Sequence, residues 1–159
     1  PAYLFLYQIQ LKKERKMLMD TKFSVALHIL AMISESDKEL SSQELALSVG
    51  TNASYIRKVI SLLKKADLIG SHQGRLGYQL NKTPDKISLL AIYYATQEVD
   101  QIKLFQVHQN SNEHCLVGKN IEQAVSPIFD AVEKQLAAEL SQKTLADVIA
   151  NLHHQCRNA

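Results

Sequence analysis

The chain has 159 residues, of which 46% are hydrophobic and 21% charged, and its formal net charge is +2. Tryptophan is absent and glycine and proline are scarce, which argues against a long β-rich architecture. A net charge this small does not by itself indicate a nucleic-acid partner. Two cysteines at distant positions and no secretory signal lead us to expect reduced thiols and a cytoplasmic location.

Residues 1–18 open without methionine and place an apolar run before a basic run. A secretory signal has the opposite order, and this apolar run is too short to cross a bilayer. We therefore expect residues 1–18 to be a non-native or disordered extension, with the native start at Met17 or Met19, and we expect no membrane partner. The alternative is a real N-terminal arm that touches DNA or a partner subunit.

Apolar residues at helical spacing predict a first helix over Thr21–Ile33. A second, short helix is predicted over Ser42–Ser48, because Ser41 and Glu44 are spaced as a capping box. Gly50 follows it and supplies the permissive backbone of a tight turn between helices. These features predict that the second helix ends in a sharp turn at Gly50.

A third helix is predicted over Ala53–Ala66. Its apolar residues recur at helical spacing and are expected to face the core: Ile56, Val59, Ile60 and Leu63. Small hydroxyls and lysines point the other way: Ser54, Lys58, Ser61 and Lys65. Arg57 and Lys64 lie on one flank. Such a face suits a groove of phosphates and base-edge acceptors, although a merely solvated helix face is the alternative.

A short β-hairpin is predicted next, with strands at Leu68–Ser71 and Tyr78–Leu80 around a turn framed by Gly74 and Gly77. Arg75 lies in this turn, where a cation can enter a DNA minor groove. The alternative is an exposed turn residue without a partner. Helix, sharp turn, helix and hairpin together are typical of a winged helix-turn-helix that binds DNA.

Charge is distributed in a way that supports this interpretation. Residues 41–86 hold seven Lys or Arg against three Asp or Glu, whereas residues 121–150 hold two against five. The basic half therefore coincides with the helix-turn-helix, as an electrostatic footprint for DNA would.

Beyond the hairpin, Ser88 is predicted to cap a helix that runs through Thr96. Lys103–His108 is predicted as a short strand and Gln109–His114 as a polar loop. A short segment at Lys119–Val125 is expected to end before Ser126, because a serine cap followed by proline is a strong helix-start signal. Thr144 is predicted to start a last helix.

An apolar stripe runs along the long helix that is predicted after Ser126. Its members are Ile128, Val132, Leu136 and Leu140, with Phe129 and Ala137 beside them. We expect this stripe to form a homodimer, because two half-sites of two-fold symmetric DNA need two copies of the DNA-binding helix. Packing of the stripe on its own domain is the alternative.

The fold class we expect is mainly α with a small β-hairpin wing, followed by a long C-terminal dimerisation helix. Residues 19–99 would form the winged helix-turn-helix domain, 100–118 a sensor loop and 119–159 a helical dimerisation region.

The sequence from Met19 to about Leu152 resembles the Rrf family of bacterial winged-helix regulators. This family includes the iron–sulfur cluster assembly repressor and the cysteine-metabolism repressor. The matching segments are KFSVALHILAMI, SSQELALSVGTNASYIRKVISLLKKADLIGS, GYQL, ISLLAIYYA and KTLADVI. The resemblance implies a homodimer that binds a palindromic operator, with base contacts from Ser54 and Arg57 and minor-groove entry by Arg75.

The expected DNA contacts are Ser42, Asn52, Ser54, Tyr55, Arg57, Lys58, Ser61, Lys65 and Arg75. Cluster-binding members of the family have glutamate where Arg57 stands, so the preferred base is expected to change from cytosine toward guanine. The wing is also shorter than the family's usual glycine-rich version, which weakens the assignment of Arg75.

Cluster-binding members carry three closely spaced cysteines in the loop after the fourth helix, whereas residues 100–118 hold only Cys115. We therefore expect no cluster, no metal and no cofactor. Cys115 precedes a helix start and has His108, His114 and Lys119 nearby, which favours the thiolate form. We expect it to act as a redox or electrophile sensor, as the resemblance implies for single-cysteine members; an inert cysteine is the alternative.

The expected function is a transcriptional regulator, most simply a repressor, rather than an enzyme, because no nucleophile–base pair, phosphate-binding glycine loop or paired carboxylates occur. Two other functions remain open. One is a regulator that binds a small molecule between the winged domain and the long helix. The other is a winged-helix adaptor that binds protein and no DNA.

Overall fold

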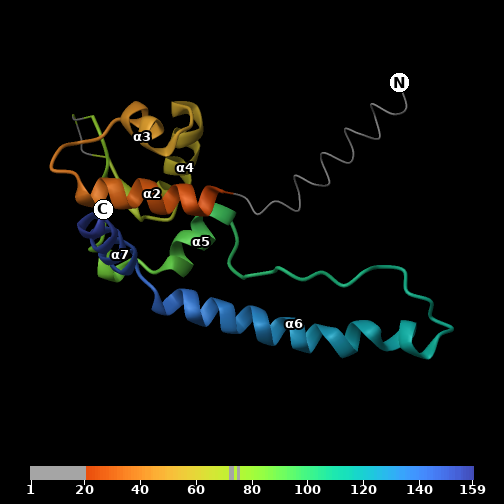
Figure 1. Ribbon diagram of the computed structural model, residues 1–159. Helices are drawn as coiled ribbons and strands as arrows, with labels where there is room; N and C mark the ends of the chain where they lie inside the picture. Colours follow the sequence, from red (N-terminus) through yellow and green to blue (C-terminus); the bar gives the residue numbers. More distant parts are fainter. Residues whose placement is uncertain (1–20, 72–73, 75) are drawn as a thin grey trace, which may run out of the picture.

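The computed structural model describes residues 21–71, 74 and 76–159 and is mainly helical (Figure 1). Its elements in chain order are α2 (Lys22–Glu35), α3 (Ser42–Val49), α4 (Ala53–Lys65), β1 (Ile69–Gly70), β2 (Gln79–Leu80), the 3₁₀ turn η1 (Pro84–Lys86), α5 (Leu89–Gln97), α6 (Leu116–Gln142) and α7 (Leu145–Asn158). The predicted mainly helical fold with one small hairpin is confirmed.

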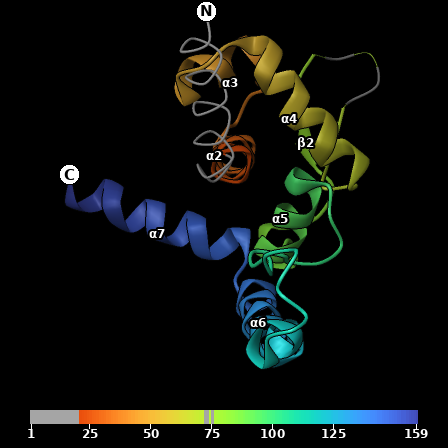
Figure 2. The same ribbon diagram turned by 90° about the vertical axis from the view of Figure 1, so that its right-hand side faces the viewer.

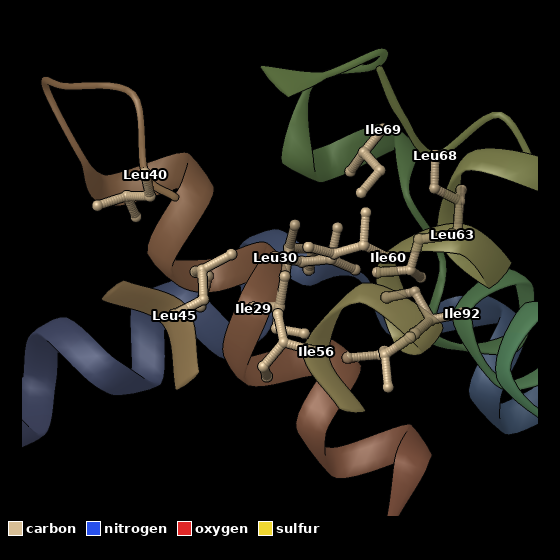
Figure 3. Close-up of a cluster of buried hydrophobic side chains, with 14 of the residues drawn as sticks. Ile29, Leu30, Leu40, Leu45, Ile56, Ile60, Leu63, Leu68, Ile69 and Ile92 are labelled. Atoms are coloured by element: carbon tan, nitrogen blue, oxygen red, sulfur yellow. The ribbon is translucent and has the colours of Figure 1, made fainter. Parts of the chain in front are cut away.

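The hydrophobic core lies between α2, α3, α4 and the hairpin (Figure 3). Ile29 and Leu30 of α2 are fully buried against Leu45 of α3 and against Ile56 and Leu63 of α4. The apolar residues of α4 recur every three or four positions, so one face of this helix enters the core and the opposite face stays outside. The predicted core residues of α4 are all buried.

Local contacts fix both ends of α3, the capped start and the turn that leads to α4. The Ser41 hydroxyl accepts a hydrogen bond from the Glu44 amide over 3.2 Å, and the Glu44 carboxylate accepts one from the Ser41 amide over 2.8 Å. The Lys38 ammonium, which donates to the Glu44 carboxylate over 2.7 Å, and the amide and hydroxyl of Ser41, which also donate to it, lower the pKa of Glu44 to about 2. Gly50 then adopts a left-handed backbone with φ of 77°, which favours glycine. The predicted capping box and glycine turn are confirmed.

The wing is the antiparallel hairpin of residues 69–80, and it is shorter than predicted. Among the described residues of the hairpin, two residue pairs form its ladder, Ile69 with Leu80 and Gly70 with Gln79. Gly77 is required on the returning arm, because it has a φ of +115° and a β-carbon there would lie 2.6 Å from the β-carbon of Glu39. The wing thus packs closely on the connection between α2 and α3.

The sequence predictions for residues 103–125 were wrong in two places. Residues 103–108 form no strand, because no other strand lies beside them in the described structure; they extend along α6 instead. The segments predicted to meet at Ser126 form one helix, α6, with Pro127 inside it. Pro127 removes one backbone donor, but it lies on an exposed side of the helix, where water can satisfy the carbonyl that loses its partner.

The last helix, α7, returns to the winged domain. Leu145 is fully buried and Ile149 nearly so in the same core as α2 and α4. A backbone bridge joins Ser88 to Thr144, and the Leu145 amide donates to the Ile87 carbonyl over 2.9 Å. Figure 2 shows α4, α5 and α6 following one another while α7 extends away from α6. The end of the region predicted for dimerisation is therefore part of the winged domain's core.

Candidate DNA-binding surface

The outer face of α4 is polar and exposed over its whole length. Ser54, Arg57, Lys58 and Ser61 are all exposed, as the helical spacing predicts. The opposite face is buried in the core, so α4 is fixed rigidly with this face outward. The helix begins with no acidic residue in its first turn, and its N-terminal amides add partial positive charge. An anionic backbone is the partner that such a surface attracts.

Two of the predicted contact residues also hold the start of α4. The Asn52 side chain accepts a hydrogen bond from the Tyr55 amide over 2.8 Å, so its carbonyl oxygen is used as the helix cap. Tyr55 is half-buried and packs against the core. The Asn52 side-chain NH₂ and the Tyr55 hydroxyl are not used in this cap and are the side-chain groups left to contact DNA.

The lysines at the end of α4 have partners within the protein. Lys65 lies 3.7 Å from the Glu98 carboxylate, and both side chains are exposed. Lys64 donates to the Ser71 hydroxyl over 2.5 Å and lies 5.1 Å above the centre of the Tyr78 ring. The sequence placed Lys64 on the flank of the helix but did not reveal these contacts, because they depend on how the wing folds back.

The tip of the wing is only partly described. Arg75 lies outside the described residues, so its predicted minor-groove role stays a prediction. Its described neighbour Leu76 is 87% exposed. Gly74 has a positive φ of 77°, in keeping with the predicted glycine-framed turn.

Cys115 is the exposed N-cap residue of α6, at the end of the loop that leads out from α5 (Figure 1). The backbone amides of Gly118 and Val117 lower the pKa of its thiol, because they stabilise the thiolate. The preceding turn is held by Asn112, whose carbonyl accepts from the Cys115 amide over 3.1 Å. Gly118 is needed there, since a β-carbon would lie 2.5 Å from the Asn112 carbonyl oxygen.

A buried carboxylate fixes the extended segment before Cys115 to α6, and the sequence did not predict it. Glu133 is only 4% exposed, and its carboxylate accepts from the amides of Leu104 over 2.8 Å and Phe105 over 3.1 Å. Lys103 reaches Glu133 at 3.1 Å and Asp130 at 2.7 Å. The amide of Phe105 is the main cause of a lowered Glu133 pKa. We call these contacts the Glu133 clasp.

The apolar stripe of α6 is exposed in the single chain. Ile128, Val132 and Leu136 are 62%, 50% and 37% exposed. The Glu133 clasp holds the neighbouring segment on another side of α6, so the chain's own loop leaves this stripe open. Exposed apolar side chains at helical spacing are characteristic of a surface that a partner covers.

The sequence of this chain is similar to those of one known protein family. A sequence profile named Rrf2 and described as "Iron-dependent Transcriptional regulator" matches residues 19–151. The chain belongs to the Rrf2 family. Rrf2 members are transcriptional regulators and not enzymes, and the predicted family is thereby confirmed.

Individual relatives agree with this Rrf2 assignment. A Bacillus subtilis (strain 168) protein named "Putative HTH-type transcriptional regulator YwnA" is 44% identical over 135 residues, which cover 85% of this chain and 99% of that protein. A crystal structure described as "a putative DNA binding protein" is 40% identical with a TM-score of 0.66, covering 80% of this chain and 98% of its own. The structure of CymR, "the Global Cysteine Regulator of B. subtilis", shares the fold at 22% identity with a TM-score of 0.60, covering 84% and 96%.

The iron in the Rrf2 family description does not fit the donors of this chain. Cys115 and Cys156 are free thiols on different helix ends, and the described residues contain no group of three or more His, Cys, Asp or Glu side chains that could hold a metal ion. A cluster held within one subunit needs more thiolates than residues 100–118 provide. No helix in the described part of the chain combines the length and apolar character needed to span a bilayer.

Proposed function

We propose that this Rrf2 protein is a cytoplasmic repressor that binds a palindromic operator as a homodimer and carries a thiol switch at Cys115. The exposed hydroxyl and cationic face of α4 is the observation on which the proposal rests. In the proposed complex, α4 enters the major groove of the DNA, with Ser54 and Arg57 at base edges and Lys58 and Ser61 on the DNA backbone. Arg57 selects guanine, whose O6 and N7 accept from a guanidinium.

The homodimer is supported by the exposed stripe of α6. Ile128, Val132 and Leu136 would be covered by the same stripe of a second copy, in a self-complementary interface. A symmetric dimer presents two copies of α4 to two half-sites, which is the reason that a palindromic operator is expected. The stripe lies on the same helix as the N-cap Cys115, so one element joins the proposed dimer contact to the proposed sensor.

The thiol switch is supported by the exposure and lowered pKa of Cys115. The thiolate attacks one oxygen of a peroxide, the O–O bond breaks, and a sulfenic acid and hydroxide result. A sulfenic acid can no longer accept from the Val117 and Gly118 amides as an anion does. Loss of that negative charge beside the Gly118 and Val117 amides would shift the loop and the start of α6, change the spacing of the two α4 helices, and weaken operator binding.

A gel-shift titration of the full chain against its own upstream region, with reduced protein and with peroxide-treated protein, tests the proposal. Reduced protein should bind tightly, with an affinity that falls steeply with salt, and oxidised protein should bind more weakly. Replacing Lys58 with alanine should weaken binding to every sequence, whereas replacing Arg57 should change the preference among sequences. Binding that is unaffected by both changes would refute the proposed docking face, and binding to proteins but not DNA would favour an adaptor.

A further inference from the structure

The wing is held by very few hydrogen bonds of its own. Its ladder consists of the pairs Ile69–Leu80 and Gly70–Gln79. In the same register the next pair outward would be Ser71 with Tyr78, and that pair is not formed. Two-residue strands are short for an independently stable hairpin in water. The direction of the wing must therefore depend on contacts outside the ladder.

Lys64 occupies the place where the ladder stops. It lies in the last turn of α4, and its ammonium donates to the Ser71 hydroxyl over 2.5 Å. The same ammonium lies 5.1 Å above the centre of the Tyr78 ring, within the range of a cation–π contact. Ser71 follows β1 and Tyr78 precedes β2, so one side chain contacts both arms of the wing.

These contacts distinguish Lys64 from Lys58, which we assign to the DNA-facing side of α4. Within the described residues Lys58 has no ion pair or hydrogen bond, and it is exposed near the centre of the outer face. Lys64 lies on the flank toward the wing and uses its charge on Ser71 and Tyr78. The two lysines share charge and helix, which makes Lys58 a matched control for Lys64.

We propose that Lys64 is a positioning residue that ties both arms of the wing to α4, so that the helix and the wing dock on DNA as one rigid unit. The role of Lys64 in docking rests on the proposed DNA-binding function. Its contacts with Ser71 and Tyr78 do not depend on that function. Without the tether, the two ladder pairs, the Asn81 amide on the Leu68 carbonyl and the packing of Gly77 on Glu39 still hold the base of the wing. The arms at Ser71 and Tyr78 lose their common anchor and must be ordered again when DNA binds. The entropy lost in ordering the wing lowers the affinity for DNA, although no phosphate contact is lost.

The geometry is tested first on the free protein by amide hydrogen exchange. Lys64→Met should speed exchange of residues 69–71 and 78–80 by about fivefold, since local opening follows the loss of a tertiary contact. Lys64→Arg keeps the charge and can stack on the Tyr78 ring, so its exchange should stay within about twofold of wild type. Ser71→Ala should raise exchange in the same residues, and Lys58→Met should leave it unchanged. Unchanged exchange in Lys64→Met would overturn the tether.

Operator titration of double variants provides the second test. Arg75→Ala serves as the change at the wing tip. Lys64→Met combined with Arg75→Ala should lose no more affinity than the larger single loss, because both act through the wing, whereas Lys58→Met combined with Arg75→Ala should be additive. If Lys64→Met instead is additive with Arg75→Ala and lowers the salt slope by about one, Lys64 is a phosphate contact and the proposal fails. If all three single variants bind DNA as wild type does, the proposed function fails, while the exchange experiment still decides the tether.

Discussion

Arg57 on α4 donates a hydrogen bond to the hydroxyl of Ser42, the first residue of α3, across 3.3 Å. The two residues are fifteen positions apart and meet because the Gly50 turn brings the start of α3 beside the first half of α4. This contact restrains the direction of the guanidinium before any DNA arrives. Restraint of this kind lowers the entropy lost when an arginine binds a base edge.

The Ser42 contact can be tested through base preference. Ser42→Ala should reduce the ratio of affinities for guanine over cytosine at the position that Arg57 contacts by about threefold, which is at the lower end of the net contribution of one hydrogen bond. Ser42→Thr retains the hydroxyl and is the matched control. Competitive titration with operators that differ at that base measures the ratio. A fall in affinity that is equal for both operators would instead make Ser42 a backbone contact.

The α6 stripe predicts an effect on oligomeric state. Val132→Asp places a charge in the exposed stripe and should convert the dimer to a monomer, because an unpaired charge cannot be buried in an apolar interface. Gln123→Asp introduces the same charge on another exposed side of α6 and should leave the dimer intact. Light scattering after size exclusion measures both masses. A monomeric wild type, or dissociation by either variant alike, would contradict the proposed interface.

Thiol reactivity should reflect the N-cap position of Cys115. In a Cys156→Ser variant, Cys115 is the only thiol of the sequence, and the pH at which its alkylation is half-maximal should lie below the ordinary value of 9.0. A lowered pKa means that the thiolate is already present at lower pH. The same variant in denaturant provides the reference, because unfolding removes the Val117 and Gly118 amides. Equal midpoints in the two states would contradict this prediction.

The Glu133 clasp predicts a pH-dependent anchoring of residues 102–105. The pKa of Glu133 is lowered in the folded chain, so its stabilisation is complete above the ordinary value of 4.5 and is lost as the pH falls through the lower folded value. Glu133→Gln removes the charge that Lys103 and the two amides share, and it should speed exchange of the Leu104 and Phe105 amides at pH 7. Glu139→Gln, an exposed glutamate of the same helix, is the control. Equal exchange in both variants would refute the clasp.

Packing of α7 into the winged domain predicts a large loss of stability on truncating Leu145. Leu145→Ala removes a fully buried side chain and should lower the free energy of unfolding by about 2–5 kcal/mol. Leu152 lies on the same helix and is 42% exposed, so Leu152→Ala should lower the free energy of unfolding by less than about 1 kcal/mol. Urea denaturation monitored by circular dichroism measures both. Similar small losses would show that α7 contributes little to the core.

The winged helix-turn-helix was predictable because its signals are local. The Ser41–Glu44 capping box, the left-handed Gly50 and the buried and exposed faces of α4 each depend on residues within a few positions of one another. The cap at Thr144, with its hydrogen bonds to Asp147, belongs to the same class of signal. Short-range hydrogen bonds and helical periodicity need no knowledge of the remaining chain.

The contacts that long-range packing decides were not predictable in this way. Residues 103–108 lack helical periodicity and so were predicted as a strand, but in the described structure no neighbouring strand pairs with them, and the carboxylate of Glu133, about thirty positions away, accepts from the Leu104 and Phe105 amides instead. Ser126 and Pro127 carry a start signal, yet the helix that begins at Leu116 continues through them. Neither outcome is visible until α6 and the segment lie side by side.

Local patterning thus specified the identity of α4 as a two-faced helix in a winged domain, because capping bonds and apolar periodicity act over one or two turns. Tertiary structure alone decided that Lys64 meets Ser71 and Tyr78, that Ser42 restrains Arg57 and that Leu145 joins the core. Each of those contacts joins residues whose separation along the chain gives no hint of nearness. Only the burial of several apolar faces at once brings them together.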